Sequence, residues 1–77
     1  MIFRIYVNFK PGILDPEAEA INKTIKNMGF KCVEKISKGK FFDIKVKNDK
    51  DYIKEIEKIS IELLSNPIIE NFKIIKK

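Results

Sequence analysis

Hydrophobic and polar residues alternate strictly from residue 2 to residue 10. A period of two over this length predicts a half-buried β-strand. Pro11-Gly12 then ends the strand, because both residues favour turns. The apolar face of the strand carries Phe3, Ile5, Val7 and Phe9, and the opposite face carries Arg4, Tyr6, Asn8 and Lys10.

A helical period replaces the alternation after this turn. Asp15 is a favourable N-cap, Pro16 suits the first helical position, and acidic residues follow near the positive end of the helix dipole. Gly29 stands where a helix commonly ends. The apolar face of this predicted helix repeats at steps of three and four, with Ala18, Ile21, Ile25 and Met28.

Two strands are predicted next. The first, over about residues 31–38, is irregular because Val33 and Ile36 are three positions apart, which a β-bulge would reconcile. Gly39-Lys40 is predicted to form a hairpin turn into the second strand. The second strand alternates cleanly, with Phe42, Ile44 and Val46 on its apolar face.

A second amphipathic helix and a last strand complete the pattern. Asn66-Pro67 ends the helix, because proline excludes the residue before it from helical conformations. In the strand predicted over residues 68–75, Phe72 and Ile74 are expected to face the helices. The inward stripe of the helix comprises Tyr52, Ile56, Ile59 and Leu63, and Ile53 and Leu64 widen it.

The order β-α-β-β-α-β predicts an α+β fold of the ferredoxin-like kind. Both helices need an apolar surface, and one sheet face is the only such surface that the pattern offers. We therefore expect an antiparallel four-stranded sheet with two helices on one face. Because 77 residues are about half the usual domain length, residues 1–77 are expected to form a single domain.

Composition limits the chemistry. The sequence has no histidine and one cysteine, Cys32, which excludes an internal disulfide, a Cys/His zinc site and a His-based catalytic relay. The three glycines are scattered singly, unlike a phosphate-binding loop. We predict no catalytic residue, no cofactor-binding residue and no metal ligand in this chain.

The formal net charge is +5, and basic residues gather in the strand segments. Aromatic residues among basic ones on an open sheet face raise a single-stranded nucleic-acid module as an alternative. The outer face is expected to carry Arg4, Lys10, Lys45 and Lys47, with Tyr6 and Phe41 among them. The glycine-aromatic signature of such sheets is poorly matched here, so no nucleic-acid partner is expected. The apolar runs are too short to span a membrane and the start is unlike a signal peptide, so we expect a cytoplasmic protein without a membrane partner.

A chain of this size buries a limited fraction of its surface. The sheet face away from the helices is expected to expose Tyr6, Phe41, Ile69 and Ile75. Apolar sheet surface of this kind is usually covered. We therefore predict at least a homodimer.

Four short stretches, in their order and spacing, resemble PurS, the small subunit of phosphoribosylformylglycinamidine synthase, over almost the whole chain. They are Lys10-Pro11-Gly12-Ile13-Leu14-Asp15-Pro16, Met28-Gly29-Phe30, Gly39-Lys40 and Leu63-Leu64-Ser65-Asn66-Pro67-Ile68-Ile69-Glu70.

The resemblance implies a role in the fourth step of purine synthesis. The phosphoribosylformylglycinamidine synthase complex of that family converts formylglycinamide ribonucleotide, glutamine and ATP to formylglycinamidine ribonucleotide. This chain would be its non-catalytic small subunit, forming a homodimer or a dimer of dimers. It would bridge the glutaminase subunit and the large synthetase subunit and assist ammonia transfer between them. ATP and Mg²⁺ would be used by the large subunit, with no cofactor in this chain.

Two turns are predicted contact sites for the synthetase or the glutaminase. Loops carry function more often than packed elements do, and lysines can attract an acidic partner. The same residues could instead serve turn geometry alone. The two predicted contact sites comprise Lys38, Gly39 and Lys40, and Ser65, Asn66 and Pro67.

An ACT-like small-molecule-binding regulatory domain is the alternative family. Pro11-Gly12-Ile13-Leu14 also satisfies the strand-to-helix turn of that class. Asp15-Pro16 and the segment 66–70 are not part of its pattern. An ACT domain should bind an amino acid in a calorimetric titration, which separates it from a PurS-like subunit.

Overall fold

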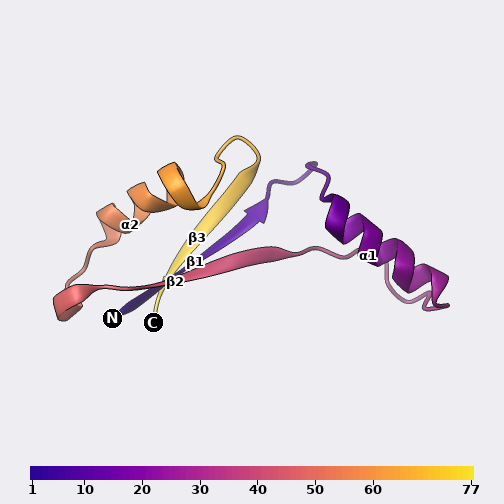
Figure 1. Cartoon of the computed structure of the whole chain (residues 1–77), viewed down its shortest axis with the longest axis horizontal. Helices are drawn as coiled ribbons and strands as arrows, with labels where there is room; N and C mark the ends of the chain where they lie inside the picture. The colour runs from indigo at the N-terminus through magenta and orange to yellow at the C-terminus, as the bar shows by residue number, and fades with distance from the viewer.

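The computed structural model describes residues 1–77, apart from the side chain of Asp49. The sheet is antiparallel with strand order β2-β1-β3 (Figure 1), so the predicted α+β class is confirmed. The elements are β1 (Ile2–Phe9), α1 (Pro16–Asn27), β2 (Gly39–Lys45), a 3₁₀ turn (Lys47–Asp49), α2 (Ile53–Ile59), a π-helical turn (Ser60–Leu64) and β3 (Glu70–Lys76).

The expected four-stranded sheet is not confirmed, because residues 31–38 form no strand within this chain. The predicted hairpin at Gly39-Lys40 is wrong, since Gly39 begins β2 and pairs with Asn8 of β1. A Cβ atom at position 39 would overlap the Asn8 side chain and lie 2.8 Å from the Val7 carbonyl oxygen. Glycine is needed there for close strand approach, whereas Gly12, with a φ of 87°, does occupy a left-handed turn.

The hydrophobic core lies between one sheet face and α2. Phe3, Ile5 and Val7 of β1 are at most 1 % exposed, and Ile56 of α2 packs against them at 2 %. This arrangement confirms the alternation predicted for residues 2–10. Partly buried side chains from the neighbouring elements surround the cluster, including Phe42, Ile44, Val46, Tyr52, Leu64, Phe72 and Ile74.

A π-helical turn extends α2 and changes which side chains face inward. The buried Ser60 donates its hydroxyl hydrogen bond to the Ile56 carbonyl at 2.8 Å, and the Ser65 N–H donates to the Ser60 carbonyl at 3.0 Å. A π-turn takes more residues than an α-turn, so the side chains that follow are rotated about the axis. Leu63 is therefore 77 % exposed, and Leu64 takes the inward position. The predicted inward orientation of Leu63 is wrong.

The helix α1 lies beyond the end of the sheet, so that only α2 covers it (Figure 1). Among the described residues, the core cluster and the side chains packed on it include none from α1. The radius of gyration is 16.1 Å, against about 11.5 Å expected for a compact chain of this length. We call residues 16–38, which comprise α1 and the segment that returns from it to β2, the arm.

The helices described here are all too short or too polar to cross a lipid bilayer.

Candidate interaction surface

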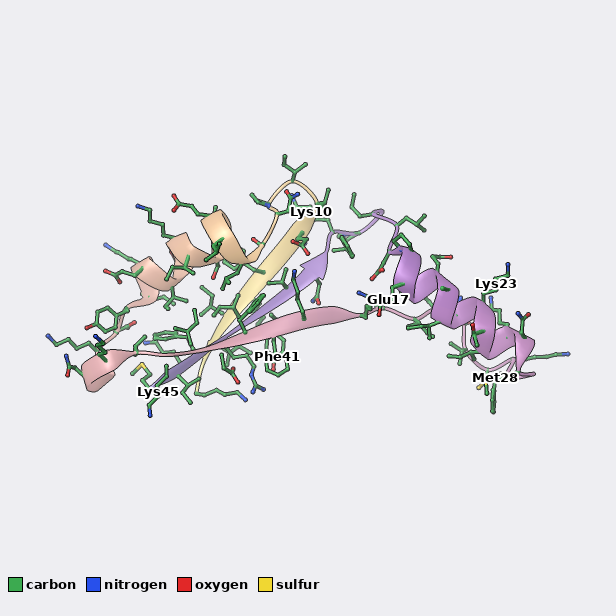
Figure 2. The ribbon with its side chains drawn as sticks, viewed as in Figure 1. Lys10, Glu17, Lys23, Met28, Phe41 and Lys45 are labelled. Carbon is green, nitrogen blue, oxygen red and sulfur yellow. The ribbon has the colours of Figure 1, made fainter. Side chains whose placement is uncertain are left out.

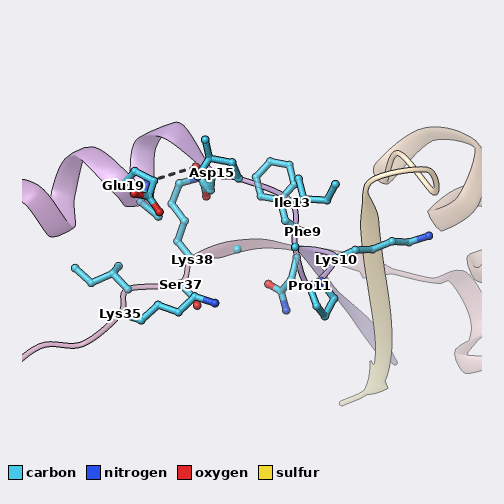
Figure 3. Close-up of a pocket in the computed structure, with 15 residues that line it drawn as sticks. Phe9, Lys10, Pro11, Ile13, Asp15, Glu19, Lys35, Ser37 and Lys38 are labelled. Atoms are coloured by element: carbon cyan, nitrogen blue, oxygen red, sulfur yellow. Dashed lines mark hydrogen bonds and ion pairs between the residues drawn. The ribbon is translucent and has the colours of Figure 1, made fainter.

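An open cleft of about 740 Å³ lies where the sheet ends and the arm begins. One wall is the connection from β1 to α1, and the other is the end of the arm before β2 (Figure 3). Its lining mixes charged side chains, such as Lys10, Asp15 and Lys35, with apolar ones. The apolar side chains are Phe9, Pro11, Ile13, Leu14, Ala18 and Ile36. The cleft is therefore an open, partly apolar surface at the root of the arm.

An ion-pair cluster joins the two chain connections at this root. Asp15 caps α1 by accepting hydrogen bonds from the N–H groups of Glu17 at 3.0 Å and Ala18 at 3.3 Å. Lys38 Nζ lies 3.3 Å from Asp15 Oδ2 and 3.4 Å from Glu17 Oε2. The cluster ties the start of α1 to the end of the arm, and the Lys38 charge is paired within the chain.

The cluster shifts the pKa of both principal partners. Burial raises the pKa of Asp15, but the Ala18 N–H and Lys38 together outweigh it and hold that pKa below its usual value. The contact with Asp15 raises the pKa of Lys38. Both groups are therefore charged near neutral pH, as the cluster requires.

The rest of the predicted contact site around Lys38 lies on β2. Gly39 occupies the close contact with β1 described above. The ammonium group of Lys40 is 5.8 Å from the centre of the Phe42 ring. Lys40 is exposed, so an acidic partner can reach it, whereas Lys38 already pairs with two carboxylates.

The second predicted contact site is a hydrogen-bonded turn. The Asn66 side-chain oxygen accepts from the Ile68 N–H at 3.1 Å, and the Asn66 N–H donates to Glu70 Oε1 at 2.7 Å. The Ser65 hydroxyl donates to the Ser60 carbonyl at 2.7 Å. These bonds give Ser65 and Asn66 a structural role, and Pro67 lies between them and Ile68, which is 80 % exposed. A contact with another subunit stays a prediction for this turn.

The outer sheet face, which carries Phe41 (Figure 2), is organised around one arginine. Arg4 makes two hydrogen bonds to the Asp43 carboxylate, at 2.8 and 2.9 Å, and its guanidinium carbon lies 4.1 Å from the centre of the Phe41 ring. The hydrogen bond from Arg4 lowers the pKa of Asp43. Part of the positive charge predicted for this face is thus neutralised, and Arg4 covers part of Phe41.

Several exposed apolar side chains belong to the arm and to the connection that leads into it from β1. The sequence pattern assigned the α1 stripe to the core, yet Ile21 is 41 % and Met28 67 % exposed. Leu14 and Phe30 are also exposed. An amphipathic stripe predicts that a helix face will be covered, but it does not show what supplies the covering surface.

A family model named PurS and described as phosphoribosylformylglycinamidine (FGAM) synthase matches residues 2–77. The chain belongs to the PurS family. The PurS subunit of Archaeoglobus fulgidus is 38 % identical over 77 residues, which cover 97 % of this chain and 96 % of that relative. Family membership makes this chain the PurS subunit of FGAM synthase, which acts in purine biosynthesis. It also decides between the PurS resemblance and the ACT-like alternative.

Solved PurS structures share the fold. Bacillus subtilis PurS superposes with a TM-score of 0.85 at 25 % identity, covering 96 % of this chain and 94 % of that chain. A chain of the structure described as PurLQS from Thermotoga maritima superposes with a TM-score of 0.77 at 22 % identity. That match covers 100 % of this chain and 99 % of the other. The extended arm is therefore compatible with the shape of known PurS chains.

Proposed function

We propose that this chain is a non-catalytic subunit that associates with itself and bridges the glutaminase and synthetase subunits of FGAM synthase. The observation that supports this most strongly is the PurS family match over residues 2–77. The name PurLQS, given to the Thermotoga maritima structure, describes a PurS chain together with PurL and PurQ in that organism. We extend the same assembly to this chain and assign it to the cytoplasm.

The bridging role follows from the chemistry of ammonia. Ammonia released from glutamine is mostly protonated near neutral pH, and the protonated form has no lone pair with which to attack the activated amide. A subunit that aligns the donor and acceptor sites shortens the path through water and keeps more ammonia reactive. In this proposal ATP and Mg²⁺ are bound by the synthetase, and this chain holds neither.

The residues that dock the larger subunits are proposed to include the two predicted contact sites. Lys40 is the best-placed charged residue of the first site, because Lys38 pairs with Asp15 and Glu17. Asn66 and Pro67 present the exposed Ile68 from a turn whose hydrogen bonds already fix its shape. A preformed turn loses little conformational entropy on binding.

Sedimentation velocity of the chain mixed with the synthetase and glutaminase subunits from the same source tests the proposal. We expect a ternary complex that does not form when this chain is omitted. Lys40→Glu should weaken assembly, with normal thermal stability of the variant alone. Asn66→Asp keeps the side-chain oxygen that accepts from the Ile68 N–H, so the turn should stay folded. Weaker assembly of this variant would then indicate a lost contact with another subunit and not a lost turn.

Two results would count against this function. Equal assembly of the glutaminase and synthetase without the chain would refute the bridging role. Wild-type assembly of both variants would place the docking surface elsewhere, most directly on the acidic helix faces around Glu19 and Glu55.

A further inference from the structure

The two most exposed large apolar side chains in the part of the chain that the structure describes lie near each other in sequence, where α2 leads into β3. Leu63 is 77 % exposed and Ile68 is 80 % exposed. We call residues 60–70, which comprise the π-helical turn and the connection to β3, the tip (Figure 1). We propose that the tip is a docking site for a protein surface with an apolar hollow bordered by Lys or Arg side chains. The proposal rests on the bridging function proposed above and adds the chemistry of one of the two partners.

The π-helical turn places Leu63 on the outside of the molecule. The Ser60 carbonyl accepts two hydrogen bonds, from the Ser65 N–H at 3.0 Å and from the Ser65 hydroxyl at 2.7 Å, which hold this wide turn in place. Leu64 packs against the core instead of Leu63. A regular helix would turn Leu63 towards the sheet, so the distortion exposes a side chain that could have been buried. Such π-turns are rare and frequently occur at functional sites.

The connection that carries Ile68 is fixed from two sides. Within the connection, the Asn66 side-chain oxygen accepts from the Ile68 N–H at 3.1 Å, and the Asn66 carbonyl accepts from the Glu70 N–H at 2.7 Å. From the sheet, the Lys10 N–H donates to the Ile69 carbonyl at 2.8 Å. The tip is therefore a preformed surface, and such a surface loses little conformational entropy when a partner binds.

The tip is acidic, although the whole chain has a formal net charge of +5. Residues 60–70 include Glu62 and Glu70 and contain no lysine or arginine. Glu62 is exposed, and Glu70 Oε1 accepts from the Asn66 N–H at 2.7 Å. Lys10 lies beside the tip through its backbone hydrogen bond, and its one positive charge leaves the two carboxylates in excess. An apolar surface with an acidic border is complementary to an apolar partner surface with a basic border.

A bridging subunit needs a separate surface for each of its two partners. The strand order β2-β1-β3 places β2 and β3 at opposite edges of the sheet. Lys40 is exposed on β2, whereas the tip leads into β3. The two surfaces therefore differ in charge and belong to different edges, so one larger subunit can dock at Lys40 while the other docks at the tip.

Titration of the chain with the synthetase alone and with the glutaminase alone, followed by sedimentation velocity, tests the tip. Leu63→Ser removes the apolar contact and Glu62→Lys reverses the border charge, and both side chains are exposed, so the urea midpoints should match the wild type. We expect each variant to bind one of the two subunits about tenfold more weakly and the other normally.

Salt and a matched control separate the charge from the apolar contact. Raising the ionic strength should weaken the tip contact of the wild type more than that of Glu62→Lys. Glu55→Lys makes the same charge reversal near the start of α2 and should leave both binary contacts unchanged. Lys40→Glu should weaken binding of the other subunit instead.

Each opposing result overturns a defined part of the proposal. Normal binding of both subunits by Leu63→Ser and Glu62→Lys would refute the tip as a docking site and leave the bridging function standing. Weaker binding by Leu63→Ser with normal binding by Glu62→Lys would refute the basic border of the partner, as would an equal loss in Glu55→Lys. A Leu63→Ser chain that sediments differently from the wild type on its own would show that the tip faces a second copy. A wild-type chain that binds neither subunit would refute the bridging function and the docking site with it.

Discussion

Gly39→Ala should destabilise the chain through a clash with β1. The added Cβ overlaps the Asn8 side chain and approaches the Val7 carbonyl oxygen to 2.8 Å. Asn8 can rotate at the surface, but the Val7 carbonyl belongs to a buried strand and is held in the sheet. Forcing an extra carbon into such a contact costs about 1–3 kcal/mol.

A double-mutant cycle separates this clash from other roles of Gly39. Asn8→Ala removes the side-chain part of the overlap, so the double variant should recover about 1 kcal/mol relative to additivity. Urea unfolding at one fixed protein concentration measures the cycle, because self-association makes stability concentration-dependent. Gly29→Ala is the matched control. The φ of 95° at Gly29 strains an alanine there, but no atom lies within 4 Å of the added Cβ, so this variant has backbone strain without a steric clash.

The cycle has clear opposing results. Additive effects of Gly39→Ala and Asn8→Ala would refute the Asn8 part of the clash, and an unchanged urea midpoint of Gly39→Ala would refute the contact with the Val7 carbonyl. A stable Gly39→Ala variant that loses only assembly with the larger subunits would assign Gly39 to docking, as the sequence pattern also allowed.

Two further predictions concern stability. Ile56→Ala should lower the free energy of unfolding by about 2–5 kcal/mol, because Ile56 is 2 % exposed and packs against β1 side chains. Leu63 is 77 % exposed, so Leu63→Ala should change the free energy of unfolding of the isolated chain by less than about 0.5 kcal/mol, and urea titration compares the two variants. Three aspartates, Asp15, Asp43 and Asp51, have pKa values lowered in the fold, so their stabilisation is present above the unfolded value of about 3.9 and is lost as the pH falls through the folded values. The urea concentration at the unfolding midpoint should therefore decrease as the pH is lowered below about 4. Asp43→Asn should make this decrease smaller, and the same pH dependence in the variant and the wild type would contradict a contribution of the Arg4–Asp43 pair.

Much of the local structure could be predicted from the sequence because local patterns determine it. The alternation over residues 2–10 predicts β1, and Asp15 caps α1 through the hydrogen bonds that its position suggests. The outcome differs at the end of α2. There Ser60 is buried and its carbonyl accepts the bond from Ser65, so the helix widens in a way that the apolar stripe does not encode.

The arrangement of the arm could not be predicted, because its contacts have the same chemistry within one chain or between two. A strand pattern over residues 31–38 pairs equally well with its own β2 or with that of a second copy. The sequence predicts a turn at Gly39, but glycine suits close strand contacts as well as turns. The pairing of Lys38 with Asp15 depends on where the chain connections lie in space, which no spacing along the sequence reveals.

The most direct test of the bridging role is FGAM synthesis by the glutaminase and synthetase subunits, measured with and without this chain. The account predicts that glutamine-dependent synthesis needs this chain, while synthesis from a high concentration of added ammonium salt proceeds without it. Ammonia supplied from solution bypasses transfer between subunits, so the ratio of the two rates isolates the role of this chain. Equal glutamine-dependent rates in its presence and absence would contradict the account.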